Sequence, residues 1–109
     1  MSELSSLTAT LIKFRNARDW AQFHNPKDLA LALSIEAGEL NECFLWKKAE
    51  DANCEKVAEE LADVFAYALL LAHEMKLDVE TIVREKIQKN ELKYPVDKAK
   101  GSAAKYNEL

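Results

Sequence analysis

Glycine and proline are nearly absent from the chain, and this scarcity limits the folds open to it more than any other feature. The 109 residues include two Gly and two Pro, too few to punctuate the short strands of a β-sandwich or barrel. No glycine-rich loop is present to hold phosphates as a P-loop or Rossmann fold does. More than half of the residues are Ala, Leu, Glu, Lys or Arg, which favours helix. We therefore predict one all-α domain over residues 1–109, folded as a four-helix bundle subunit.

Apolar spacing and capping residues predict four helices. Their expected ranges are about residues 5–21, 26–46, 54–75 and 79–94. Asn25, Asn53 and Asp78 are suited to cap the last three of these helices, and the final stretch 96–109 is weakly patterned.

On the first expected helix, Leu7, Leu11 and Phe14 share one face, and polar residues such as Lys13 and Arg15 are expected on other faces.

The second expected helix is apolar on nearly every side. Leu29, Leu31, Leu33 and Ile35 alternate with alanines around its cylinder. Four helices in a chain of this size cannot easily enclose one of their own, so we expect a second subunit to cover the remaining apolar surface.

Acidic residues are concentrated in the middle of the chain. Residues 34–74 carry ten carboxylates and three lysines, a net charge of −7, whereas the whole chain has a net charge of −4. With a pI of about 5.2, the protein lacks the basic surface of a nucleic-acid binder. The acidic middle indicates bound cations instead.

Membrane insertion and secretion are not expected. The longest uncharged stretch, residues 64–73, has ten residues, about half of the roughly 20 that a membrane-spanning helix needs. No secretory signal is readable at the N-terminus, so we expect a cytoplasmic protein with Cys43 and Cys54 as reduced thiols.

Two acidic pairs with a spacing of three residues are the candidate metal ligands. Glu36 and Glu39 share a face of the second expected helix, and Glu60 and Asp63 share a face of the third. All-oxygen ligands suit Mg²⁺ or Mn²⁺. A di-iron or metal-storage bundle would use Glu-x-x-His pairs, which are missing. The same spacing also arises on solvated faces, so the residues alone leave both possibilities open.

The same pairs make the sequence resemble a known family, the MazG-like all-α nucleoside triphosphate pyrophosphohydrolases, and within it the dCTP pyrophosphatase subgroup. The family pattern is Glu-x-x-Glu, a gap, then Glu-x-x-Asp. Further segments similar to the subgroup are Asp19-Trp20, Phe23-His24-Asn25-Pro26, Phe44-Leu45-Trp46 and Lys93-Tyr94-Pro95-Val96.

The resemblance implies a role for each candidate residue. It makes Glu36, Glu39, Glu60 and Asp63 the metal ligands and the catalytic residues. It places Trp20, His24, Trp46 and Tyr67 around the base and sugar, and Lys86, Asn90 and Lys93 near the phosphates. Tyr67 follows Asp63 by four residues, so its ring is expected on the same helix face, one turn away.

The implied activity is Mg²⁺-dependent hydrolysis of a (d)NTP to a (d)NMP and pyrophosphate, with Mn²⁺ as a possible substitute. The implied substrates are surplus or modified dNTPs, such as dCTP or dATP. A short connection between Trp46 and Glu60 leaves the preferred base open. The resemblance also implies a tetramer built from two dimers, with residues 96–109 at a subunit interface. The alternative is a non-catalytic helical oligomer that acts as a nucleotide sensor or interaction module.

Overall fold

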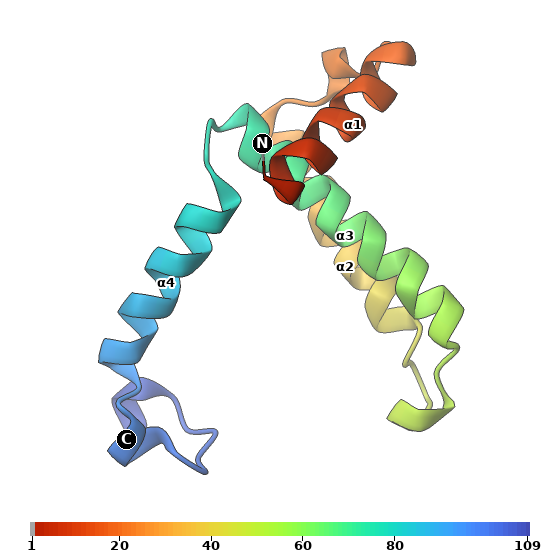
Figure 1. Cartoon of the computed structure of the whole chain (residues 1–109). Helices are drawn as coiled ribbons and strands as arrows, with labels where there is room; N and C mark the ends of the chain where they lie inside the picture. Colours follow the sequence, from red (N-terminus) through yellow and green to blue (C-terminus); the bar gives the residue numbers. More distant parts are fainter. Residues whose placement is uncertain (1) are drawn as a thin grey trace. The chain divides into compact units, whose positions relative to one another are not determined.

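The computed structural model describes residues 2–109, which form helices and turns without a strand (Figure 1). The α-helices are α1 (Glu3–Ala17), α2 (Pro26–Glu42), α3 (Cys54–Glu74), α4 (Val79–Lys93) and the short α5 (Val96–Ala99). Three 3-10 helices are η1 (Ala21–Phe23), η2 (Ala49–Asp51) and η3 (Tyr106–Glu108). The all-α prediction is confirmed. None of the described helices has the length and apolar character that a membrane span requires.

The chain forms two compact units, the first ending at Leu77 and the second covering Asp78–Leu109. The expected single domain over residues 1–109 stays a prediction.

The capping residues act as predicted. The side chains of Asn25, Asn53 and Asp78 accept hydrogen bonds, of 2.9, 3.1 and 3.0 Å, from the backbone N–H three residues later. Each bond satisfies one of the N–H groups that a helix start leaves without a partner. Ser2 caps α1 in the same way, so α1 begins two residues earlier than expected.

The first helix ends at Ala17, four residues before its expected end. Asp19 adopts a left-handed backbone conformation with φ of 57°, and the Trp20 N–H donates to the Arg15 carbonyl at 2.9 Å. Glycine usually occupies this helix-terminating position, but Asp also tolerates it. Residues 18–25 are thereby free to fold back as a connection that contains η1.

The second helix is also shorter than expected. It ends at Glu42, and single turns continue to Trp46, where φ is 60°.

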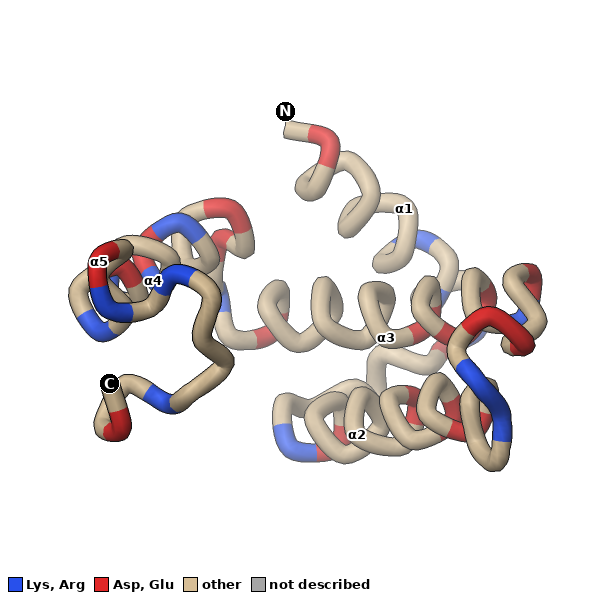
Figure 2. Tube along the Cα trace, turned by 90° about the horizontal axis from the view of Figure 1, so that it is seen from below, with Lys and Arg blue, Asp and Glu red and all other residues tan. Residues whose placement is uncertain are grey.

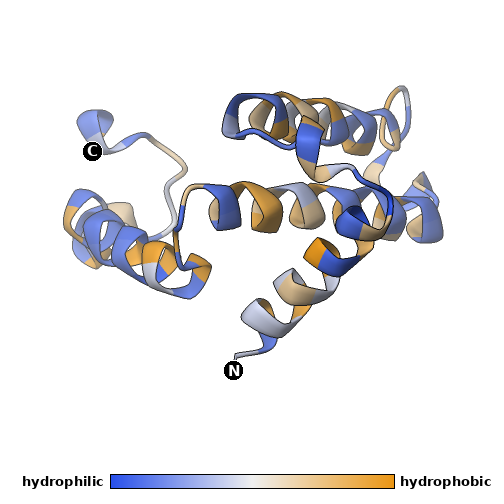
Figure 3. Ribbon diagram, turned by 90° about the horizontal axis from the view of Figure 1, so that it is seen from above, coloured by the Kyte–Doolittle hydropathy of each residue, from blue (hydrophilic) through white to orange (hydrophobic). Residues whose placement is uncertain are grey.

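The first unit is built on α2 and α3, which pack side by side in opposite directions, with α1 against α3 (Figure 1). Figure 3 shows an apolar stretch of α3 between hydrophilic ends. The buried apolar side chains among the described residues are Leu29, Cys43, Leu69, Leu70 and Ala72. Arg15 lies among them with 6% of its surface exposed. The expectation that Arg15 occupies a polar face of the first helix is therefore wrong.

The second unit consists of α4, α5 and η3. The rings of Tyr94 and Tyr106 meet edge to face with centroids 6.2 Å apart. The Lys93 ammonium lies 4.9 Å from the Tyr106 ring. These contacts attach the end of the chain to the end of α4.

We expect Asn25→Ala to lower the free energy of unfolding by about 1 kcal/mol, because the first turn of α2 loses its capping acceptor. Thermal or urea unfolding measures this change. Asn41→Ala is the matched control, since Asn41 is exposed in the last turns of the same helix and its side chain forms no hydrogen bond with residues 2–109. Equal stability of Asn25→Ala and the wild-type protein would contradict the assigned role of the cap.

Candidate functional site

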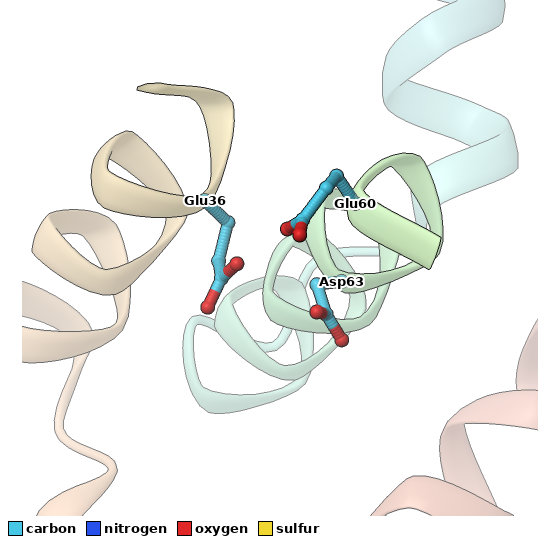
Figure 4. A group of neighbouring side chains, drawn as sticks. All are labelled: Glu36, Glu60 and Asp63. Carbon is cyan, nitrogen blue, oxygen red and sulfur yellow. The ribbon is translucent and has the colours of Figure 1, made fainter. Parts of the chain in front are cut away.

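Acidic residues are frequent toward the end of α2 and the start of α3 (Figure 2). The pairing of the two helices brings Glu36 of α2 opposite Glu60 and Asp63 of α3 (Figure 4). One carboxylate oxygen from each of these residues lies within 4.8 Å of the other two. Three of the four carboxylates that were predicted to face one another are therefore close together.

Two carboxylate oxygens of this acidic cluster lack a partner. Glu36 Oε2 and Glu60 Oε2 are both buried and accept no hydrogen bond from any of residues 2–109. An unpaired buried carboxylate oxygen is costly, and a divalent cation is a natural partner for several of them. Glu36, Glu60 and Asp63 therefore fit a divalent metal ion by donor type and by proximity.

Glu36 is the most perturbed carboxyl group of the cluster. A hydrogen bond with Glu39 in its protonated form, removal from water, and repulsion by Glu39, Asp63 and Glu60 raise the pKa of Glu36 to about 7. Burial, then the neighbouring Glu39 and Asp63, also raise the pKa of Glu60. Glu39 is exposed and is not part of the three-residue cluster, but it raises the pKa of both Glu36 and Glu60.

A pocket of about 390 Å³ lies in the first unit and includes Asp63 in its wall, so it adjoins the acidic cluster. Its lining residues are Leu11, Phe14, Arg15, Trp20, His24, Asp63, Ala66, Tyr67 and Leu70. Three of the residues predicted to surround a base, namely Trp20, His24 and Tyr67, are among them. The early end of α1 makes this possible, because the connection after Asp19 carries Trp20 and His24.

The aromatic side chains of the pocket meet edge to face. Trp20 packs against Phe14 with ring centroids 5.7 Å apart, and His24 lies 6.4 Å from Tyr67. Burial and the nearby carboxylates of Glu36, Asp63 and Glu39 raise the pKa of Tyr67. The Tyr67 hydroxyl therefore keeps its proton. The wall of the pocket is mostly apolar and carries a few polar atoms.

Arg15 and Glu74 form an ion pair beside this pocket that the sequence analysis did not find. Arg15 Nη2 donates to Glu74 Oε1 at 2.5 Å, and Arg15 Nη1 lies 3.4 Å from His24 Nδ1. The spacing along α1 could have indicated that Arg15 is buried, because Arg15 follows Leu11 by four residues and so continues the apolar face of this helix.

The remaining predicted residues lie outside the pocket wall. Trp46 is in the turns after α2 with 94% of its surface exposed. Lys86, Asn90 and Lys93 belong to α4 in the second unit. Their contacts with a nucleotide stay predictions.

Comparisons with known proteins agree with this geometry. The model of the MazG-like family matches residues 31–109, which include most of α2, all of α3 and all the cluster carboxylates. The chain belongs to the MazG-like family. The family resemblance predicted from the sequence is confirmed.

Relatives of this MazG-like chain include dCTP pyrophosphatase 1 from Bos taurus, 39% identical over 105 residues. The corresponding protein from Homo sapiens is 38% identical. Each alignment covers 89% of this chain and 62% of the relative, so the chain spans about three fifths of the relatives' length.

A solved structure, a pyrophosphatase from Archaeoglobus fulgidus, superposes on the MazG-like chain with a TM-score of 0.81 at 36% identity. The superposition covers 87% of this chain and 94% of the archaeal chain.

We expect the metal-free MazG-like protein to lose stability as the pH rises. The pKa of Glu36 moves from an ordinary 4.5 to about 7 on folding, so the folded state binds the proton more tightly in this range. The stability that this proton contributes is present below pH 4.5 and is lost as the pH rises through about 7. Chemical unfolding in EDTA at several pH values measures the effect.

The Glu36→Gln variant should show a weaker loss of stability between those pH values, because it removes the titrating group. Glu59→Gln, an exposed neighbour on α3, is the matched control and should retain the full pH dependence. A pH-independent stability of the metal-free wild-type protein would contradict the crowding of carboxylates described above.

Proposed function

We propose that the protein hydrolyses nucleoside triphosphates to nucleoside monophosphates and pyrophosphate with the help of a divalent metal ion. The observation that carries this proposal is the shared residue Asp63, which belongs both to the acidic cluster and to the wall of an aromatic-lined pocket. A base in the pocket and a triphosphate beside the cluster is the arrangement that this adjacency favours.

The aromatic pocket supplies binding of the base. Trp20 and Tyr67 offer rings for stacking, which is worth roughly 1–3 kcal/mol per base. Stacking is tolerant of base identity, so these rings alone do not select one nucleotide. The dCTP pyrophosphatase relatives make dCTP the first candidate, followed by dATP and modified dNTPs. Removal of surplus or non-standard nucleotides in the cytoplasm is the proposed role.

The carboxylates supply the site for the reaction at phosphorus. Glu36, Glu39, Glu60 and Asp63 would hold Mg²⁺, for which Mn²⁺ can substitute, because all of their donors are carboxylate oxygens. When bound, the metal supplies positive charge for the phosphates and for the leaving pyrophosphate, and it makes water a better nucleophile. A cluster glutamate accepts the proton of the attacking water. Trp46 over the base, and Lys86, Asn90 and Lys93 near the phosphates, complete the proposed site.

We expect Glu36→Gln, Glu39→Gln, Glu60→Gln and Asp63→Asn each to abolish turnover while the protein stays folded. Each variant keeps the shape of the side chain and removes one negative charge. The measurement is release of pyrophosphate from a panel of dNTPs with Mg²⁺. The Glu59→Gln variant serves again as the matched control and should retain the wild-type rate.

Two results would contradict the proposed activity. Orthophosphate with a nucleoside diphosphate would place the cleavage at the terminal phosphate, and full activity in excess EDTA would exclude dependence on a metal. Nucleotide binding without hydrolysis by the wild-type protein would favour a nucleotide sensor.

We also propose that the functional form is an oligomer, with a tetramer of two dimers as the candidate. Leu31 and Ile35 of α2 are 56% and 64% exposed, and Phe65 of α3 is 59% exposed. Exposed apolar surface on this scale marks an interaction face. Residues 96–109 are proposed to lie at a subunit boundary.

Sedimentation at micromolar concentration should show a species larger than the 12.4 kDa chain. Ile35→Glu should shift it toward smaller species, because a charge would be buried at the contact. Lys27→Glu, at an exposed polar position of the same helix, is the control. A stable, folded monomer would contradict this proposal.

A further inference from the structure

Arg15 is a buried charge to which the proposed reaction assigns no role. It is 6% exposed and lines the pocket together with Leu11, Phe14 and Leu70. It pairs with Glu74 from the end of α3, and its buried Nε atom has no hydrogen-bond partner among residues 2–109. An ion pair with an unsatisfied donor is a poor way to stabilise a core, since two apolar side chains in its place often stabilise a protein as well or better. A buried ion pair of this kind beside a pocket therefore indicates that the pair positions another group of the pocket.

That group is His24. Arg15 Nη1 lies within hydrogen-bond distance of His24 Nδ1, and both residues line the pocket. A guanidinium group has donors only and stays protonated in proteins. His24 Nδ1 must therefore be the acceptor, which requires a lone pair on that nitrogen. A neutral imidazole with its lone pair on Nδ1 carries its proton on Nε2.

We propose that Arg15, anchored by Glu74, is a positioning residue that fixes the His24 ring with its proton on Nε2, so that the pocket offers the nucleotide a hydrogen-bond donor. This inference rests on the proposed function for the identity of the ligand. The donor suits a carbonyl oxygen or an unprotonated ring nitrogen of a base. Among residues 2–109 no side chain or backbone group forms a hydrogen bond with Nε2.

The charges around His24 support a neutral ring. Burial and the positive charge of Arg15 on α1 lower the pKa of His24, and Glu74 on α3 opposes them more weakly. Tyr67 on α3 faces His24 edge-on and is uncharged at neutral pH. Asp63 belongs to the same pocket wall but is not among the groups that shift the pKa of His24.

The first test is nitrogen-15 NMR of the histidine side chains in the metal-free, nucleotide-free protein. The chain contains two histidines, and the exposed His73 is an internal reference that should show both neutral forms. His24 should show a single neutral form with the proton on Nε2 at neutral pH. A proton on Nδ1, or a cationic ring at that pH, would overturn the proposal without any enzyme assay.

The second test compares two variants. Arg84→Met/Glu80→Met removes an exposed ion pair of α4 and is the matched control, so the His24 form and the KM for dNTPs should stay as in the wild type. Arg15→Met/Glu74→Met replaces the pair by apolar side chains of similar length. In this double variant His24 should populate both neutral forms. We expect KM to rise about three- to tenfold, the effect of one neutral hydrogen bond, with kcat within about twofold.

The double variant is expected to fold, because it leaves no buried charge unpaired, and circular dichroism checks this. An unchanged His24 form or an unchanged KM in the folded double variant would overturn the positioning role. Lack of turnover by the wild-type protein would contradict the proposed function instead, and the NMR measurement would still decide the role of Arg15.

Discussion

Repulsion among carboxylates that face one another between α2 and α3 is the constraint on which the rest of the structure depends. Glu36, Glu60 and Asp63 approach within 4.8 Å, and nothing in their own chemistry holds them together. The apolar packing of α2 against α3 further along the pair supplies the opposing free energy. The cluster draws on the second half of α2 and the first half of α3, whereas the buried Leu69, Leu70 and Ala72 lie further along α3.

The division of each helix into a packed part and a reactive part follows from this constraint. The carboxyl-terminal half of α3 carries Leu69, Leu70 and Ala72 into the core, whereas its first half carries the acidic residues. Tyr67 lies between the two parts and faces the pocket. One straight helix therefore links the stable core, the base pocket and the carboxylates, so a distortion of α3 would disturb all three.

The acidic pairs and the caps could be predicted from sequence because both depend on local spacing. Residues three apart share a helix face whatever the rest of the chain does, and Asn25 satisfies the start of α2 through neighbouring atoms. The pocket depends on longer-range events. It requires Asp19 to end α1 in a left-handed conformation that glycine would have signalled more clearly. It also requires Glu74, 59 residues away in sequence, to pair with Arg15. Periodicity records neither event, so Arg15 was expected on a polar face.

The ion pair of Arg15 and Glu74 also fixes how far along α3 the helix α1 is placed. Leu4, Leu7 and Leu11 on the same side of α1 are aliphatic and recur at nearly one-turn intervals, so a shift of about 5.4 Å, one helical turn, would put one leucine near the place of another. Such a shift would separate the guanidinium from its carboxylate and leave a charge in apolar surroundings. A single polar contact thus selects one register from several that the aliphatic side chains would accept.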